Sequence, residues 1–165
     1  MPHSSIAVAN EFLKLSEKDG VPVSPMKLQK LLYYAQGWHL GFKDSPLIHE
    51  QVECWAYGPV FRTLYQATKR FGSGTVQGPP LLISGHRTKD MECDDDDASL
   101  QLVRKVWESY KQYSAIHLSN MTHADDSPWK KVRDEFKAYE PPAGTDIPME
   151  YIKDHFKNLA KQGQS

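Results

Sequence analysis

The chain has no excess of charge of either sign. Its 165 residues include 20 Lys and Arg against 21 Asp and Glu, which gives a net charge of -1 at pH 7. A protein that binds nucleic acid or an anionic membrane over a broad face needs a marked positive charge. The composition therefore excludes a global attraction to either, and such binding would need a local patch.

Cysteines and long apolar runs are also scarce. The two cysteines, Cys54 and Cys93, belong to no CxxC pair, so we interpret both as reduced thiols, with a zinc site as the weaker alternative. The N-terminus lacks the basic segment and apolar run of a secretory signal, and no window reaches the length needed to span a bilayer. These features predict a soluble, cytoplasmic protein with no membrane partner.

The motifs of common catalytic and metal sites are missing as well. The seven histidines form no HExxH pattern, and no GxSxG or P-loop sequence occurs. The acidic run Asp94–Asp97 lacks the spacing of a calcium-binding loop, and we interpret it as a solvated segment that favours the start of the next helix. We therefore predict no catalytic residue, no cofactor and no metal.

Helical spacing of apolar residues dominates what is present. The clearest helical segments are 6–17, 25–41, 60–71, 114–121, 127–139 and one that begins near residue 148, and another follows the aspartate run with apolar positions Leu100, Val103, Trp107 and Tyr110. Ser24–Pro25 and Ser127–Pro128 are typical helix starts, because the serine hydroxyl can accept from a free amide and proline at the first helical position forfeits no hydrogen bond. The pattern predicts a mainly α fold of the α+β class: one compact domain over residues 1–165, with about six helices and a small β-hairpin or extended element.

The β element is expected in residues 46–57, where β-branched and aromatic residues alternate with polar ones. Gly58–Pro59 is expected to end it and to open the following helix. Residues 81–84 are the candidate partner strand that would complete a small hairpin.

The segment from Lys27 to Leu40 combines a core stripe with a surplus of aromatic, amide and basic side chains. The stripe predicts an amphipathic core helix, and its members are Leu28, Leu31, Leu32, Ala35 and Phe42. Residues off the stripe are expected to be exposed, where tyrosine, tryptophan and arginine commonly contact partners. The candidate partner-binding residues are Lys27, Lys30, Tyr33, Gln36, Tyr57 and Arg62. A structural role is expected for Trp38, Trp55, Gly58, Pro59 and Trp129.

Three stretches together resemble a known family, the Panacea antitoxin domain, which includes SocA-like antitoxins and phage-associated GepA-like proteins. They are residues 26–40 (MKLQKLLYYAQGWHL), residues 53–61 (ECWAYGPVF) after Pro46–Leu47, and residues 118–123 (LSNMTH) with Ser127–Trp129. The resemblance implies a mostly helical domain, often encoded beside a toxin in prophage or mobile regions, that neutralises its toxin by direct binding. In SocA-like members it also implies delivery of the toxin to the ClpXP protease. It transfers no catalytic residue. The chain departs from the family at Cys54, which stands where a small or acidic residue is expected next to Trp55, and at Asp94–Asp97, an insert that is not part of the motif.

Two other functions stay open from the sequence. Helices on either side of Gly20–Pro22 superficially resemble a helix-turn-helix, so a DNA-binding regulator of a prophage or toxin–antitoxin locus is the alternative. Its second helix carries only Lys27 and Lys30 as basic residues, and base recognition usually needs several side chains in the groove. A metal-dependent enzyme is the least favoured hypothesis.

Overall fold

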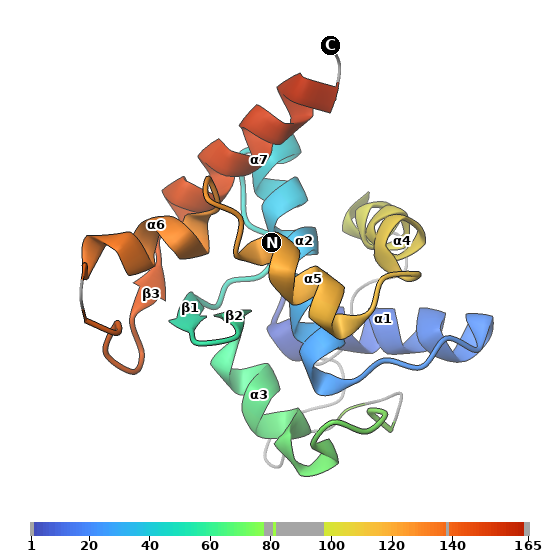
Figure 1. Cartoon of the computed structure of the whole chain (residues 1–165). Helices are drawn as coiled ribbons and strands as arrows, with labels where there is room; N and C mark the ends of the chain where they lie inside the picture. Colours follow the sequence, from blue (N-terminus) through green and yellow to red (C-terminus); the bar gives the residue numbers. More distant parts are fainter. Residues whose placement is uncertain (1, 78–80, 82–97, 138, 164–165) are drawn as a thin grey trace.

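The computed structural model describes residues 2–77, 81, 98–137 and 139–163 (Figure 1). Seven α-helices occur within these ranges: α1 (Ser5–Asp19), α2 (Pro25–Lys43), α3 (Arg62–Thr68), α4 (Ala98–Tyr110), α5 (Ala115–Thr122), α6 (Pro128–Glu135) and α7 (Met149–Gly163). A short 3-10 turn, η1 (Lys69–Phe71), follows α3, and the strands are β1 (Val52–Trp55), β2 (Gly58–Val60) and β3 (Asp146–Ile147). The predicted mainly α fold of the α+β class is confirmed, with seven helices instead of about six.

Serine caps begin four of the helices. Ser4, Ser24, Ser114 and Ser127 each accept a hydrogen bond from the amide three residues later. The first helix therefore begins one residue earlier than predicted. Ser5, the first residue of α1, is not the cap. Its amide and its hydroxyl both donate to the Glu50 carboxylate, at 2.6 and 2.8 Å.

Several predicted helix ends differ from those of the structure, and two of them lack the expected glycine. The second helix continues to Lys43, where Asp44 ends it in the left-handed conformation with φ 57°. Helix α6, predicted over 127–139, ends at Glu135, since Phe136 already leaves the helix and Lys137 takes φ 54°. Neither end carries the glycine that marks the end of α1, where Gly20 has φ 66°.

The sheet differs most from expectation. Gly58–Pro59 does not open a helix, because it forms strand β2, antiparallel to β1 with Trp55 opposite Gly58. Proline fits there because β2 is an edge strand of the order β2-β1-β3. The third strand comes from Asp146–Ile147, far along the chain, and pairs with Val52–Glu53. The predicted partner strand 81–84 lies outside the described residues except for Leu81.

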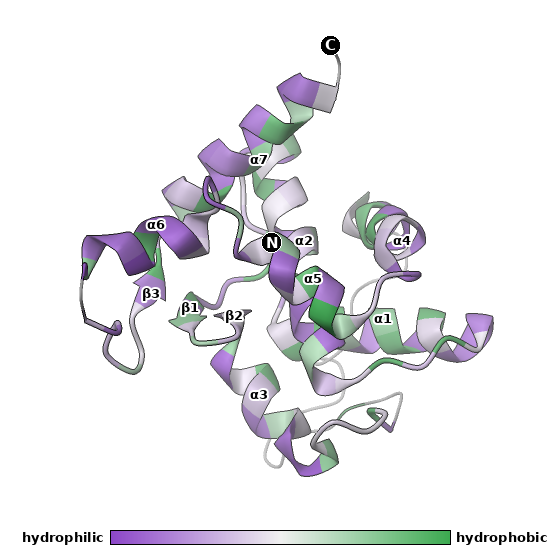
Figure 2. Ribbon diagram, in the orientation of Figure 1, coloured by the Kyte–Doolittle hydropathy of each residue, from purple (hydrophilic) through white to green (hydrophobic). Residues whose placement is uncertain are grey.

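Helix α2 is the centre of the molecule (Figure 1). Helices α1, α4, α5 and α7, together with β2 and α3, all pack against it. Almost its whole length is therefore buried, so the prediction of an amphipathic helix with one exposed side is wrong. The prediction that Phe42 belongs to the core stripe is also wrong, because its side chain is 59% exposed at the end of the helix. Hydrophilic residues prevail instead along α6 and the outer part of α7, at the edge of the fold (Figure 2).

The approach of α7 to α2 depends on glycine. The ring of Phe156 lies directly over Gly37, where a Cβ atom would be only 2.1 Å from Cε2 of that ring. At Gly41 the corresponding distance to Cβ of Phe156 is 3.1 Å. No helix within the described ranges is long and apolar enough to cross a membrane.

Candidate functional site

The turn between β1 and β2 is where the sequence motifs meet in space. We call the outward-facing side chains Trp55, Tyr57, Arg62 and Tyr65 the hairpin surface. Tyr57, at the tip, is 71% exposed. Side chains of α2, α5 and α6 bind the main chain at and around it.

Side chains from three helices hold the main chain of this turn. Trp129 Nε1 of α6 donates to the carbonyl of Trp55 (2.6 Å), Ser119 Oγ of α5 to that of Tyr57 (2.8 Å), and Lys30 Nζ of α2 to that of Pro59 (3.2 Å). Each bond gives a main-chain carbonyl of the hairpin a side-chain donor. The turn is therefore held at three points of its main chain.

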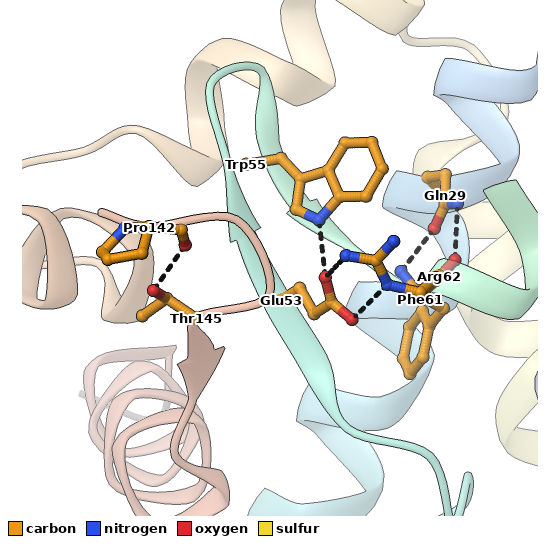
Figure 3. Close-up of polar contacts among 7 residues, drawn as sticks. All are labelled: Gln29, Glu53, Trp55, Phe61, Arg62, Pro142 and Thr145. Carbon is orange, nitrogen blue, oxygen red and sulfur yellow. Dashed lines mark hydrogen bonds and ion pairs between the residues drawn. The ribbon is translucent and has the colours of Figure 1, made fainter. Parts of the chain in front are cut away.

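The end of β2 is fixed by a glutamine of α2 (Figure 3). Gln29 Nε2 donates to the carbonyl of Phe61 at 3.0 Å, and the Phe61 amide donates back to Gln29 Oε1 at 2.9 Å. All of these groups are buried. The side-chain amide thus replaces a neighbouring strand at this edge.

Gly58 is required by the close approach of the turn to the helices. Its φ is 119°, a conformation that side chains rarely adopt. A Cβ atom there would lie 2.9 Å from Thr122 Oγ1 and 3.0 Å from Lys30 Cε. The structural role expected for Gly58 therefore has a specific cause: only glycine lets α2 and α5 reach the turn.

Two basic groups lie beneath the turn with lowered pKa values. Burial lowers the pKa of Lys30 to about 7. Burial and the nearby charge of Lys30 lower the pKa of His123, against the opposing effect of its hydrogen bond to the Tyr57 main chain. The His123 ring stacks on Trp129 at 3.8 Å, and no group in the described part of the chain bonds its Nε2.

The outer side of the hairpin is ordered by one carboxylate (Figure 3). Glu53 accepts from Arg62 Nε and Nη2, both at 2.9 Å, and from Trp55 Nε1 at 3.0 Å. Burial alone would raise the pKa of Glu53, but these hydrogen bonds outweigh burial and lower it. Arg62 lies 5.5 Å above the Trp55 ring, and Tyr65 packs against the same ring at 4.7 Å. The hairpin surface is thus a rigid group of aromatic and guanidinium side chains.

Only two of the six candidate contact residues are exposed. Tyr57 and Arg62 lie on the hairpin surface, whereas Lys27, Lys30, Tyr33 and Gln36 are buried, so their predicted exposure is wrong. The reason is that α1, α3, α4, α5, α7 and β2 all pack against α2. Of the buried four, Tyr33 packs edge-to-face on Phe156 of α7.

The polar groups of α2 bind main chain instead of partners. Lys27 Nζ donates to the carbonyl of Lys111. Gln36 accepts from the amides of Leu47 and Ile48, both at 2.9 Å, and donates to the Ile48 carbonyl at 2.9 Å. These polar side chains therefore fix loops around the central helix.

The remaining structural candidates divide between two regions. Trp55 lies in the hairpin, and Trp129 of α6 donates to its main chain. Trp38 lies on the other side of α2, where its Nε1 donates to Tyr110 Oη at 3.0 Å and its ring stacks on Phe42. Sequence reasoning gave no role to Gln29 or Ser119, although both lie within the stretches that carried the family resemblance. Side-chain bonds to main chain leave no periodic signal.

The structure also bears on the alternative chemistries. Within the described residues no group of three or more His, Cys, Asp or Glu side chains could hold a metal ion. Cys93 and Asp94–Asp97 lie outside those residues. Helix α2 cannot be the recognition helix of a helix-turn-helix as it stands, because both of its candidate lysines are buried.

Comparison with known proteins identifies the class. The family described as "Antitoxin SocA-like, Panacea domain" matches residues 28–130. The chain therefore belongs to this family, and the resemblance seen in the sequence is confirmed. The matched region runs from α2 into α6 and includes every side chain that holds the hairpin.

The chain is similar in sequence to the Antitoxin SocA of Caulobacter vibrioides (strain NA1000 / CB15N). It is 29% identical over 133 residues, which cover 74% of this chain and 66% of that protein. The chain thus spans about two thirds of the length of the curated relative it matches. No solved structure matches this chain.

Proposed function

We propose that this protein is an antitoxin that neutralises its toxin by direct contact through the hairpin surface. One observation carries the proposal beyond family membership. The main chain of the turn is held by side chains of α2, α5 and α6, while Tyr57 at its tip is left 71% exposed. The mode of action proposed is binding without catalysis.

The physical argument is preorganisation. A loop that is already fixed in its bound conformation pays less entropy when a partner binds. The side chains it presents are of the types that contribute most at protein interfaces, namely tryptophan, tyrosine and arginine. This combination supports a recognition surface better than it supports a purely structural turn, which would not need an exposed aromatic tip.

The surface extends onto α5. Ile116 is 70% exposed and lies one helical turn before Ser119, whose hydroxyl binds the Tyr57 carbonyl. Residues three apart share a face of a helix. We therefore propose that Ile116 contributes apolar contact area next to Tyr57.

The four candidate residues of α2 are buried and are not proposed to contact the toxin. Lys27, Lys30, Tyr33 and Gln36 could touch a partner only if α2 were uncovered. We propose that Lys30, which donates to the Pro59 carbonyl, supports the surface from beneath, that the other three serve the fold elsewhere around α2, and that Tyr57 and Arg62 make the contact. The proposal places the protein in the cytoplasm, with its gene beside a toxin gene in a prophage or mobile region.

Delivery of the toxin to the ClpXP protease, which the resemblance implies for SocA-like members, is a separate part of the proposal. It is tested by the half-life of the toxin, measured with this protein in hosts that have and lack the protease. Equal half-lives in the two hosts would remove the adaptor role and leave neutralisation intact.

The direct test is co-expression with the neighbouring reading frame, read as growth of the host. The wild-type protein should restore growth, and Tyr57→Ala should fail to do so, because loss of a central aromatic contact typically weakens binding by a factor of 30 or more, about 2 kcal/mol. The matched control is Phe42→Ala, an aromatic side chain that is 59% exposed at the far end of α2. That variant should still restore growth.

Two results would count against the proposal in different ways. A neighbouring frame that is harmless alone, or whose toxicity the wild-type protein leaves unchanged, would refute the antitoxin function. Rescue by the wild type and by Tyr57→Ala alike would retain the antitoxin function and remove the hairpin as its contact surface.

A further inference from the structure

A pocket of about 350 Å³ adjoins the hairpin surface. It lies between the β1–β2 turn and the segment that links α6 to β3. Its lining residues are Cys54, Trp55, Ala56, Arg62, Arg133, Glu140, Pro141, Ala143 and Gly144. The far wall is a closed turn, because the hydroxyl and the amide of Thr145 both donate to the carbonyl of Pro142, at 2.6 and 3.1 Å (Figure 3).

The floor of the pocket is mainly apolar. Cys54 is buried there, and burial raises the pKa of its thiol to about 11, so the sulfur is neutral at physiological pH. Ala56, Pro141 and Ala143 add apolar surface. Such a floor suits an aliphatic or aromatic side chain of a partner.

Two guanidinium groups line the rim, and their carboxylate partners differ. Arg62 is bound to Glu53, whose side chain is 12% exposed and also accepts from Trp55. Arg133 lies 4.9 Å over the Trp129 ring and pairs with Glu140 at 2.6 Å. The Glu140 side chain, however, is 74% exposed.

This difference decides which pair can be exchanged. Glu53 holds three donors in a partly buried site, so it is part of the scaffold. An ion pair whose carboxylate lies mostly in water is screened and contributes little. Arg133, in contrast, is already oriented by Trp129, and its planar guanidinium can bind another carboxylate in two-point geometry. When Glu140 is displaced, the rim carries two arginines against one partly buried glutamate, Glu53.

We infer that this pocket receives a toxin segment in which an acidic residue is next to an apolar one. The partner carboxylate replaces Glu140 on Arg133, and the apolar side chain fills the floor beside Trp55. The inference rests on the proposed function and names the chemistry that the same surface recognises. Glu140 then acts as an internal competitor that occupies Arg133 while the protein is free.

The test compares the two halves of one ion pair. The probe is the purified product of the neighbouring reading frame, and the readout is its dissociation constant for each variant by titration calorimetry. Glu140→Gln should bind about threefold more tightly, because the competing charge is gone, and Arg133→Gln should bind at least about tenfold more weakly. Raising the salt concentration should narrow both differences.

The chain offers a closely matched control. Glu150 pairs with Lys153, and the Glu150 side chain is also 74% exposed. Glu150→Gln and Lys153→Gln should leave the dissociation constant unchanged. Thermal melting of every free variant checks that the fold is retained.

The signs of the effects decide the outcome. If Glu140→Gln and Arg133→Gln weaken binding together, the ion pair serves the structure and the inference is overturned. It is equally overturned if neither variant changes the affinity while the wild type binds, and in both cases the antitoxin function stands. Absence of wild-type binding would reject the proposed function together with this inference.

Discussion

Replacing Gly37 with alanine should destabilise the protein by about 2 kcal/mol, since the side chain has no room against α7. A Cβ atom at this position would lie 2.1 Å from Cε2 of Phe156 and 2.4 Å from each of two further ring carbons. Carbon atoms in contact prefer about 3.5–4.0 Å. The overlap therefore amounts to well over one ångström on three atoms.

The ring of Phe156 cannot turn away from this clash. It is fully buried, and its centroid lies 5.8 Å from that of Tyr33, 5.9 Å from Tyr34 and 5.0 Å from Trp38. The helices must therefore move apart. Overpacking of this kind costs about 1–3 kcal/mol or more, and the higher helix propensity of alanine returns about 1 kcal/mol of it.

The assay is reversible denaturation in urea, with thermal melting as a second measure. For a chain of this size a loss of 2 kcal/mol corresponds to a fall of about 4–8 °C in the melting temperature. Gly41→Ala should show a smaller loss, because its Cβ would lie 3.1 Å from Phe156. Gly163→Ala is the control, since nothing lies within 4 Å of its Cβ position, and it should change stability by less than about 0.5 kcal/mol.

A double-mutant cycle identifies the cause. Phe156→Leu removes the ring atoms that clash, so Gly37→Ala should cost clearly less in that background than in the wild type. Equal stability of Gly37→Ala and Gly163→Ala would refute the reasoning, because it would mean that α7 does not rest on Gly37. Equal cost in both backgrounds would show that the ring is not the obstacle.

Three further predictions concern the polar groups of α2. Tyr33→Phe should leave the unfolding free energy unchanged or raise it by up to about 1 kcal/mol, because no group in the described part of the chain bonds its buried hydroxyl; a loss above 1 kcal/mol in urea denaturation would argue for a missed partner. Gln36→Ala should cost about 3 kcal/mol or more by the same assay, since it strands three buried main-chain groups, and a cost below 1 kcal/mol would contradict this. Burial lowers the pKa of Lys30 from 10.5 to about 7, so between these pH values the unfolded chain binds more protons than the folded one and stability rises with pH. Lys30→Met should abolish about 2 kcal/mol of that rise between pH 7 and 9. Parallel profiles of stability against pH for the variant and the wild type would exclude a lowered pKa of Lys30.

Local chemistry explains which elements could be predicted. The starts of α2, α5 and α6 follow from a serine that caps the helix, and in α2 and α6 also from proline at the first helical position. These signals act within one helical turn, so neighbouring sequence contains them. The ends at Lys43 and Glu135 carry no glycine, and they depend on how the following loops pack.

The sheet and the exposure of α2 could not be predicted for a different reason. Strand β1 pairs with Asp146–Ile147, and a two-residue strand has no period to recognise. The wheel of α2 shows one apolar stripe, but Phe156 of the distant α7 covers Tyr33 on another side. A periodicity argument assumes that one face meets the core, and α2 has neighbours on all of its faces.

By itself the sequence determined the helical class, most helix starts, the family and the motif around Tyr57–Gly58–Pro59. The tertiary structure decided which of its conspicuous residues face solvent. Lys30 and Gln36 are polar yet buried, because main-chain carbonyls and amides from other segments satisfy them. Tyr57 stays exposed because the helices bind its main-chain carbonyl and leave its side chain in solvent. Such contacts join residues far apart in the chain, and only the folded arrangement brings them together.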